Sequence, residues 1–592
     1  MRIRPGDWLA FTIVLIAVFG IGGIHLVLSA GYLMSCQMLG HPLGMWNVIP
    51  VVSAWGDASV VPGQVCVPSR GLIQVLAVIY IAVVIATIVA IYAWVEKYKE
   101  SDKKLIKDLS YRKGIAQYGE VKKNVGDKAL AKKAGSIRPT LKNPQLMDVG
   151  RKLGTSQGSN VWLSAQDTCA VFGPPRSGKG VNFVINEILD APGAVVTTST
   201  RGDNAAATWK LRAAGGAPVI IFDPQGITGV STKMRWSPYR GCEDPDVAAS
   251  RADAIVGASA LGSSSNNQEW AESSKDILTY LLHAAALGKV HISAFSRWTQ
   301  SPALAGEAVQ ILAQAPGAVA GWAQNLESEI TGDSKMVMSK WMGVKGSTRG
   351  LVIPNVAELF DVSEGQESLD PEDFVKRRGT LYLIGTKTGG GAVGPLLVGM
   401  LDDIYAAAEK IANRSPGSRL DPPMRLVLDE VANFSVWNRL PEVMSSGGGI
   451  GIGATLYLQS ASQAKDQWGD TGGAKILDSA NFIVQLGNSK EVDKLKTFVE
   501  WMGEIELTKT SYSYSDQGIT HNEDKQFRNA VSVFELSRLP MGYSFVLPNV
   551  GRPLLMRSTP FFERSDKDEI KASQKVFVKM QEAGGKLVTD GV

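Results

Sequence analysis

The sequence is poor in cysteine and carries no strong excess of either charge. Four cysteines among 592 residues do not make a disulfide scaffold. The formal net charge is only +4, so the molecule as a whole is not strongly polarised. The chain is also too long for one compact core, since about 150 residues per domain would give about four units. The sequence therefore indicates a multi-domain protein whose chemistry lies in local motifs.

Charged side chains are almost absent from two apolar stretches near the N-terminus. Residues 8–30 contain none apart from His25 when it is protonated, and residues 71–94 contain none at all. A membrane-spanning helix needs about 20 apolar residues, and both stretches reach that length. We therefore predict two transmembrane helices within a membrane anchor formed by residues 1–96. A cleaved signal peptide is the alternative for the first stretch, but its apolar run is longer than the usual core of about 7–15 residues.

Basic residues beside the two stretches predict their orientation. Arg2 and Arg4 precede the first stretch and a lysine-rich segment follows the second, whereas residues 31–70 hold one acidic and one basic residue. The positive-inside rule places residues 31–70 outside and both termini in the cytoplasm, so we predict a plasma-membrane protein with two spans. Cys36 and Cys66 then face the oxidising side. The sequence fits a disulfide between them and two unpaired apolar residues equally well.

Basic residues accumulate directly after the second stretch. Residues 97–152 contain 16 Lys or Arg against six Asp or Glu, a surplus of ten. We interpret this segment as a basic juxtamembrane connector with some helix. Two interpretations remain open, namely a solvated stalk that contacts anionic lipid and the rim of an opening that attracts nucleic acid.

The pattern of a parallel α/β sheet begins near Thr168. Short apolar runs alternate with helical stretches, and the order of strand, glycine-rich turn, helix and strand is that of a βαβ unit. From 243 to 329 the strand signals vanish, and alanine- and leucine-rich stretches with helical spacing predict an inserted all-α domain. We predict an α/β nucleotide-binding domain formed by 153–242 and 330–560, and a charged C-terminal tail at 561–592. The expected strands are 167–172, 193–199, 217–223, 380–386, 425–430, 454–460 and 482–487.

A glycine-rich segment after the first of these strands has the spacing of a phosphate-binding loop. Gly173–Lys179 matches the first seven positions of G-x-x-x-x-G-K-[ST], in which backbone N–H groups surround the phosphates and lysine reaches the β- and γ-oxygens. The eighth position is Gly180, so a water or another side chain must replace the usual magnesium-binding hydroxyl. Hydroxyls in residues 198–203 are candidates because they follow the next strand at the same sheet edge. The predicted nucleotide-binding residues are Gly173, Pro174, Pro175, Arg176, Ser177, Gly178, Lys179, Gly180 and Val181.

Two acids end a later apolar strand. In phosphoryl transfer the strand-end residue, here Asp429, holds magnesium, and the adjacent Glu430 polarises the attacking water. The plain alternative is a strand followed by a helix with an acidic first turn. Gln459, at the end of the next strand, is a candidate for contacting the γ-phosphate. The alternative is that it has no role in the site, since polar residues are common where a strand ends.

With these motifs placed, the sequence resembles type IV secretion coupling proteins of the TraG/TraD type, the membrane ATPases of conjugative DNA transfer. It is most similar to the version found in actinobacterial mobile elements, in which glycine also replaces the Ser or Thr of the loop. The resemblance implies a RecA-like P-loop motor domain with an inserted all-α domain, ATP and Mg²⁺ at the subunit interfaces of a homo-hexamer, and DNA near a central channel. The segments that carry it are 173–204, 219–226, 235–245, 426–452, 456–469 and 536–547.

The resemblance also implies roles for single residues. Gly173, Gly178 and Lys179 would bind phosphate, and Gln459 would sense the nucleotide; Asp429 would hold the metal and Glu430 would activate water. We therefore predict an ATP hydrolase that recruits a relaxase–DNA substrate and drives single-stranded DNA toward the subunits of a type IV secretion channel.

Two other functions remain open. One is an FtsK-like double-stranded DNA pump or a protein-only exporter. The presence of two spans rather than four is evidence against the FtsK-like pump. The other is a membrane receptor that binds nucleotide with little hydrolysis, a reading motivated by Gly180.

Overall fold

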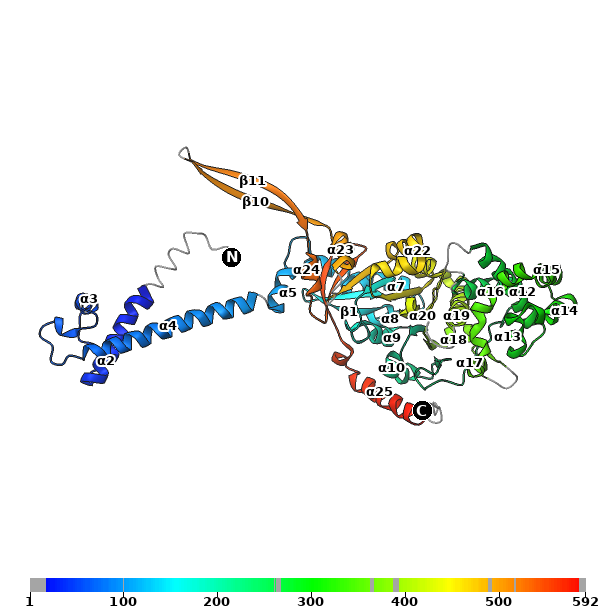
Figure 1. Ribbon diagram of the computed structural model, residues 1–592, viewed down its shortest axis with the longest axis horizontal. Helices are drawn as coiled ribbons and strands as arrows, with labels where there is room; N and C mark the ends of the chain where they lie inside the picture. The colour runs from blue at the N-terminus through cyan, green and yellow to red at the C-terminus, as the bar shows by residue number, and fades with distance from the viewer. Residues whose placement is uncertain are drawn as a thin grey trace. The chain divides into compact units, whose positions relative to one another are not determined.

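The computed structural model describes residues 17–99, 101–259, 261, 268–362, 367–386, 393–487, 492–515 and 518–584. The chain divides into two compact units, Met1–Leu105 and Ile106–Val592. Each unit has its own buried core, and we describe them separately (Figure 1).

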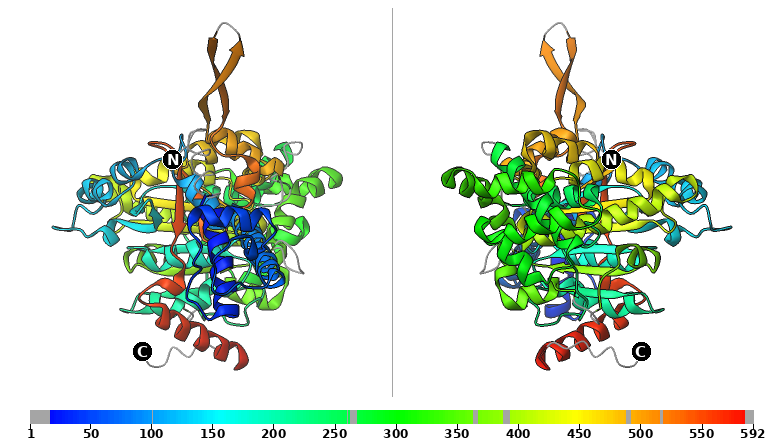
Figure 2. Two further views of the ribbon diagram at one scale, coloured as in Figure 1. Left: turned by 90° about the vertical axis from the view of Figure 1, so that its left-hand side faces the viewer. Right: turned by 90° about the vertical axis from the view of Figure 1, so that its right-hand side faces the viewer.

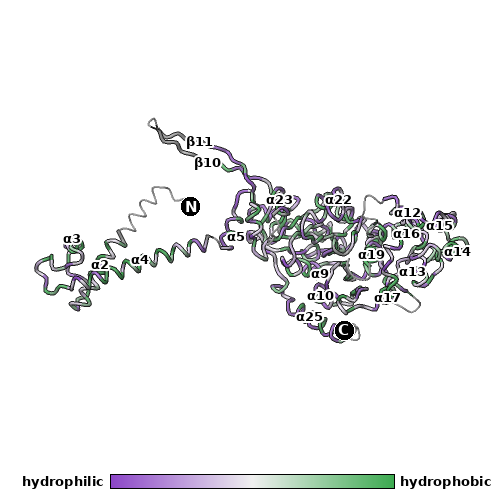
Figure 3. Tube along the Cα trace, in the orientation of Figure 1, coloured by the Kyte–Doolittle hydropathy of each residue, from purple (hydrophilic) through white to green (hydrophobic). Residues whose placement is uncertain are grey.

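The first unit contains two helices that are long and apolar enough to cross a membrane. Their apolar stretches are Phe19–Cys36 and Arg70–Tyr98. Figure 3 shows α4 as hydrophobic along most of its length. The predicted first span, 8–30, begins outside the described residues, and its helix continues to Cys36. The helices of this unit are η1 (Ala17–Ile21), α2 (Gly22–Cys36), α3 (Met45–Ser53), η2 (Ala58–Val60) and α4 (Arg70–Lys99).

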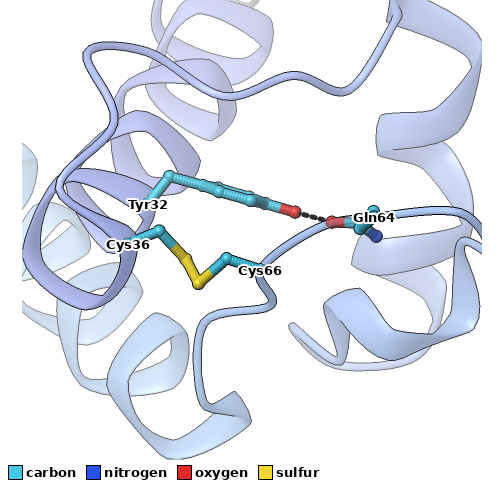
Figure 4. Close-up of a disulfide and its surroundings, with 4 residues drawn as sticks. All are labelled: Tyr32, Cys36, Gln64 and Cys66. Atoms are coloured by element: carbon cyan, nitrogen blue, oxygen red, sulfur yellow. Dashed lines mark hydrogen bonds between the residues drawn. A yellow bond between two sulfur atoms is a disulfide. The ribbon is translucent and has the colours of Figure 1, made fainter.

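A disulfide joins the end of α2 to the segment that precedes α4. Cys36 and Cys66 are bonded, with their Cα atoms 6.0 Å apart (Figure 4). Beside the bond, the hydroxyl of the buried Tyr32 donates to the side-chain oxygen of Gln64. The side-chain nitrogen of Gln64 in turn donates to the carbonyl oxygen of Ala58 at 2.7 Å. The structure thus selects the bonded form of the two cysteines, which the sequence alone left undecided.

The second unit is built on a mixed sheet of eleven strands among the described residues. Its order is β2-β1-β13-β12-β9-β3-β8-β7-β4-β6-β5. The pairs from β9 to β5 are all parallel, whereas β12, β13, β1 and β2 pair antiparallel. The strands are β1 (Gly150–Ser156), β2 (Ser159–Ser164), β3 (Cys169–Phe172), β4 (Val195–Ser199), β5 (Val219–Phe222), β6 (Thr380–Ile384), β7 (Met424–Asp429), β8 (Ile452–Leu458), β9 (Phe482–Leu486), β12 (Tyr543–Pro548) and β13 (Leu554–Ser558).

The parallel strands are those that the apolar runs predict. Every residue of β3, β4, β6 and β8 is buried, because helices cover both faces of this part of the sheet. The helices that connect these strands or follow them in the chain are η3 (Gly180–Val184), α9 (Ile185–Asp190), α10 (Asp203–Ala213), α19 (Gly394–Arg414), η7 (Pro416–Ser418), α20 (Val431–Phe434), α21 (Leu440–Ser446), η8 (Gly447–Ile450), α22 (Ala461–Asp478), α23 (Val492–Trp501) and α24 (Val533–Ser537). The α/β prediction is confirmed.

A run of helices separates β5 from β6. Trp298, Trp341 and Phe295 are buried among them, in a core that continues onto one face of the sheet. The helices continue past residue 329 to Lys376, and the domain boundaries predicted from the sequence stay a prediction. The helices between β5 and β6 are α11 (Pro245–Gly257), α12 (Gln268–Leu287), α13 (Ile292–Gln300), η5 (Pro302–Leu304), α14 (Gly306–Gln314), α15 (Trp322–Thr331), α16 (Ser334–Thr348), η6 (Arg349–Val352), α17 (Pro354–Phe360) and α18 (Pro371–Lys376).

The basic segment folds as part of the second unit from Ile106 onward. It forms α5 (Asp102–Ser110), α6 (Tyr118–Asn124), α7 (Asp127–Ile137) and α8 (Leu146–Val149), and continues into β1 and the edge strand β2. Apolar residues on one side of these helices are buried, among them Val121 and Leu130. Lysines of α6 and α7 therefore lie on short amphipathic helices that pack against β2.

Two elements near the C-terminus were not expected from the sequence. Strands β10 (Glu504–Ser515) and β11 (Gly518–Asn529) form a separate antiparallel ribbon that projects from the rest of the second unit (Figure 2). The predicted tail forms η9 (Phe561–Glu563) and α25 (Lys567–Glu582), whose Ile570 and Phe577 are buried. Ser573 of α25 donates to the carbonyl oxygen of Ala206 in α10 at 2.7 Å.

Candidate nucleotide-binding site

The order of the strands brings the predicted motifs to one edge of the sheet. Strand β3 pairs with β8, and β8 pairs with β7, so that Phe172 lies opposite Leu458 and Asp429 opposite Tyr457. Because all these strands are parallel, their carboxyl ends share an edge, and ligands of open α/β sheets bind there. The glycine-rich loop follows β3, Asp429 is the last residue of β7 and Glu430 follows it, and Gln459 follows β8, which lies between β3 and β7.

The glycines of the loop are required by its geometry. Gly178 has φ +90°, and a Cβ placed on it would lie 2.6 Å from the side-chain nitrogen of Asn182. A Cβ on Gly173 would lie 2.5 Å from the hydroxyl oxygen of Ser177. That hydroxyl is buried and has no hydrogen-bond partner among the described residues. The loop therefore turns tightly around a polar group that is left available for a ligand.

Lys179 lies back against this loop. Its Nζ donates to the carbonyl oxygen of Gly173 at 2.8 Å and to that of Leu458 at 3.3 Å. Burial lowers the pKa of Lys179, while the charges of Asp429 and Glu430 act in the opposite direction. The ammonium group thus lies within electrostatic reach of both predicted acids.

Neighbouring side chains hold the two acids in place. Asn204 donates its Nδ2 to Asp429 Oδ2 at 3.1 Å, and Thr198 donates to the Asp429 carbonyl oxygen at 2.8 Å. Partial burial, together with the charge of Glu430, raises the pKa of Asp429 to about 6. Glu430 has φ 51°, and its carboxylate accepts a hydrogen bond from Thr200. Of the hydroxyls that the sequence suggested as metal ligands, those of Thr198 and Thr200 contact the acids in this structure, whereas the Ser199 hydroxyl accepts from the backbone nitrogen of Arg201.

Gln459 lies where the sequence predicts, but its side chain is exposed. Its backbone nitrogen donates to Gln463 Oε1 at 2.8 Å. The preceding residue, Leu458, accepts hydrogen bonds from the Gly173 nitrogen and from Lys179. Gln459 is thus one residue from the contact between β8 and the glycine-rich loop.

Two residues of this region were not predicted from the sequence. Asn204 reaches Asp429 from the start of α10, and only its place after a strand hinted at this. Glu187 of α9 is fully buried and pairs with Arg151 and Arg425. No sequence pattern signals Glu187, because its partners come from distant strands.

The residues at this edge fit a nucleotide with a hard divalent cation. Carboxylate and carboxamide oxygens are the side-chain donors that Mg²⁺ accepts, and Asp429 and Asn204 supply one of each. The loop offers backbone N–H groups, the unpartnered Ser177 hydroxyl and the Lys179 ammonium for the phosphates. The fold and this site define a P-loop nucleotide-binding protein of the RecA-like class.

Comparisons with known proteins identify the family. A family model described as the type IV secretory system conjugative DNA transfer family matches residues 118–314. A second, described as the TraM recognition site of TraD and TraG, matches residues 423–541. The chain belongs to the coupling proteins of type IV secretion, as its resemblance to them led us to expect. No curated protein sequence matched the chain.

Solved structures of a coupling protein share the fold. The unbound monoclinic form of the bacterial conjugative coupling protein TrwBdeltaN70 is 18% identical with a TM-score of 0.51, and the alignment covers 72% of this chain and 91% of that one. The trigonal form in complex with sulphate is 16% identical with a TM-score of 0.52, covering 75% and 93%. The plasmid coupling protein TrwB in complex with ADP and Mg²⁺ is 16% identical with a TM-score of 0.50, covering 72% and 92%.

Proposed function

We propose that the protein is a membrane-anchored ATPase that drives single-stranded DNA toward a type IV secretion channel during conjugative transfer. The observation that carries the proposal is the arrangement of Lys179, Asp429 and Glu430 around the glycine-rich loop at one edge of the sheet. Membership in the conjugative DNA transfer family supplies the substrate class. TrwB, which shares the fold, was solved with ADP and Mg²⁺, and this supports the same ligands here.

In this proposal each side chain acts at a defined place. Lys179 leaves the carbonyl oxygens of Gly173 and Leu458 to contact the β- and γ-phosphates, and the backbone N–H groups that follow Pro175 surround them. Bound Mg²⁺ would neutralise charge on the phosphates. Asp429 holds the cation, and Glu430, oriented by Thr200, accepts a proton from the attacking water.

Gln459 would report the state of the site to the rest of the sheet. It adjoins Leu458, whose carbonyl oxygen contacts Lys179 in this structure. When Lys179 turns to a nucleotide, this contact is lost, and the end of β8 is free to shift. Movement of β8 would reach α22, which begins two residues after Gln459.

We further propose that the two apolar helices anchor the protein in the plasma membrane, with residues 31–70 outside and both termini and the motor in the cytoplasm. The disulfide between Cys36 and Cys66 supports this orientation, because such bonds persist on the oxidising side. A relaxase–DNA complex, channel subunits and assembly into a homo-hexamer complete the proposal. They rest on the family and not on a contact in this structure.

An ATPase assay on the full-length chain tests the central claim. We expect turnover that single-stranded DNA stimulates more than double-stranded DNA does. Glu430→Gln should lower turnover at least about 100-fold while nucleotide still binds, because it removes a general base. Lys179→Ala should lose nucleotide binding as well.

Two exposed residues provide matched controls. Glu442→Gln and Lys210→Ala make the same substitutions on exposed helix surfaces and should leave turnover unchanged. Turnover that neither site variant alters would contradict the proposal and indicate a nucleotide-binding receptor. Stimulation by double-stranded DNA alone would indicate a duplex pump.

A further inference from the structure

The loop lacks a hydroxyl at Gly180, and the structure shows which group faces that position. A Cβ placed on Gly180 would have one neighbouring heavy atom within 4 Å among the described residues, Asn204 Oδ1 at 3.7 Å. Asn204 is only 5% exposed. A buried carboxamide oxygen therefore faces the place where most phosphate-binding loops carry a Ser or Thr.

The other end of the same side chain fixes its orientation. Asn204 Nδ2 lies 3.1 Å from Asp429 Oδ2. An ionised carboxylate only accepts hydrogen bonds, so the amide must present its nitrogen to Asp429. Its oxygen is then directed toward Gly180, and the side chain bridges the loop and the acid.

The backbone that carries Asn204 is held by its own helix and by the C-terminal helix. Thr208 donates to the carbonyl oxygen of Asn204 at 2.6 Å. Ser573 of α25 donates to the carbonyl oxygen of Ala206 at 2.7 Å, and the Phe577 ring lies 3.5 Å from the place of a Cβ on Gly202. These contacts fix the first turn of α10, which carries Asn204, and an oriented ligand requires such support.

We propose that Asn204 Oδ1 supplies the oxygen ligand for magnesium that Gly180 cannot supply. The proposal rests on the nucleotide site proposed above and assigns it one further residue. Asparagine oxygens are hard donors suited to Mg²⁺. The hydroxyls of Thr198 and Thr200 donate to Asp429 and Glu430, and among the described residues not adjacent in the chain only Asn204 Oδ1 lies within 4 Å of a Cβ on Gly180.

The test measures the magnesium dependence of nucleotide binding by the full-length chain in nanodiscs. A fluorescent, non-hydrolysable ATP analogue is titrated in Mg²⁺ and in EDTA. The readout is the dissociation constant in EDTA divided by the dissociation constant in Mg²⁺. Asn204→Ala should reduce this ratio about tenfold or more, the usual effect of losing a group that supports a metal. Binding in EDTA should stay as in the wild type. Asn325→Ala, an exposed asparagine of the helical insertion, is the matched control.

Two variants separate a ligand from a group that only orients Asp429. Asn204→Asp keeps an oxygen facing Gly180 but loses the donor to Asp429, and it should keep the magnesium dependence. Gly180→Ser in the Asn204→Ala background should restore it, because a side chain at 180 has space.

Each result has a defined meaning. An unchanged ratio in Asn204→Ala, or equal loss in Asn204→Asp and Asn204→Ala without rescue by serine, would overturn the proposal. If the wild type binds the analogue equally with and without Mg²⁺, the metal role of Asn204 is wrong while nucleotide binding stands. If the wild type binds no nucleotide at all, the proposed function itself fails.

Discussion

Glu187 joins the helix after the phosphate-binding loop to the two strands that carry the rest of the site. Its Oε1 accepts hydrogen bonds from Arg425 at 3.1 Å and from Thr455 at 2.6 Å. Its Oε2 accepts one from Tyr457 at 2.6 Å and lies 3.0 Å from Arg151 Nη2. Arg425 belongs to β7, and Thr455 and Tyr457 belong to β8. A single buried carboxylate therefore ties α9 to both strands.

The charge balance of this cluster sets the expected cost of removing the carboxylate. Burial alone would raise the pKa of Glu187, but the charges of Arg151 and Arg425 hold it below the usual value. Glu187→Gln would leave two buried guanidinium groups without an anion. Breaking a buried pair in this way costs about 3–5 kcal/mol of unfolding free energy.

Thermal unfolding of the full-length chain in detergent measures this cost. The entropy of unfolding of a unit as long as Ile106–Val592 gives about 1 °C per kcal/mol, so Glu187→Gln should lower Tm by roughly 3–5 °C at a fixed scan rate. Glu272→Gln removes an exposed pairing with Lys275 and should change Tm by less than about 2 °C. A Glu187→Gln protein that melts within about 2 °C of the wild type would refute the reasoning.

Two further predictions concern the loop and the basic segment. Gly178→Ala should lower nucleotide affinity at least about tenfold, because a left-handed φ costs an alanine about 1–2 kcal/mol and the new Cβ would contact Asn182. Calorimetric titration of the nucleotide measures this affinity. The control variant Gly306→Ala, at a position where a Cβ has open space, should bind the nucleotide normally. Arg112 pairs with Glu535 at 2.6 Å, and although burial acts in the opposite direction, hydrogen bonds from Arg112 and Ser532 lower the pKa of Glu535 to about 2. Since this pKa lies below the unfolded value, the stabilisation is complete above about pH 4.5 and is lost as the pH falls toward 2. Because the pair is partly exposed, Glu535→Gln should lower the free energy of unfolding by about 1–2 kcal/mol at pH 7 and by almost nothing near pH 2. Chemical denaturation at each pH measures this difference. A difference that does not depend on pH would contradict the role of the Glu535 charge.

The sequence predicts the parallel strands well because most strands buried on both faces lack charged residues along their whole length. Runs such as 193–199 and 454–460 contain apolar and β-branched residues and no charged ones, and they contribute to β4 and β8. The ribbon of β10 and β11 was missed because serines, threonines and charged residues dominate it and no core face marks its period. The C-terminal helix was missed because charged residues are interspersed with its apolar ones, of which only Ile570 and Phe577 are buried.

The candidate site divides in the same way. Spacing alone locates Lys179 and the pair Asp429 and Glu430, because phosphate and metal chemistry requires those residue types in those local contexts. Their residue-level roles stay predictions until the variants are measured. Asn204 and Glu187 act on residues more than 200 positions away, and no local pattern encodes such pairs.

The amino-acid sequence by itself determined the apolar helices, the alternation of strands and helices, and the glycine, lysine and acid motifs, since each depends on residues close together in the chain. Only the tertiary structure decided that β8 lies between β3 and β7, that Cys36 is bonded to Cys66, and that a carboxamide faces Gly180. These features depend on which distant segments pack side by side, and that choice is made by burial and pairing across the whole fold.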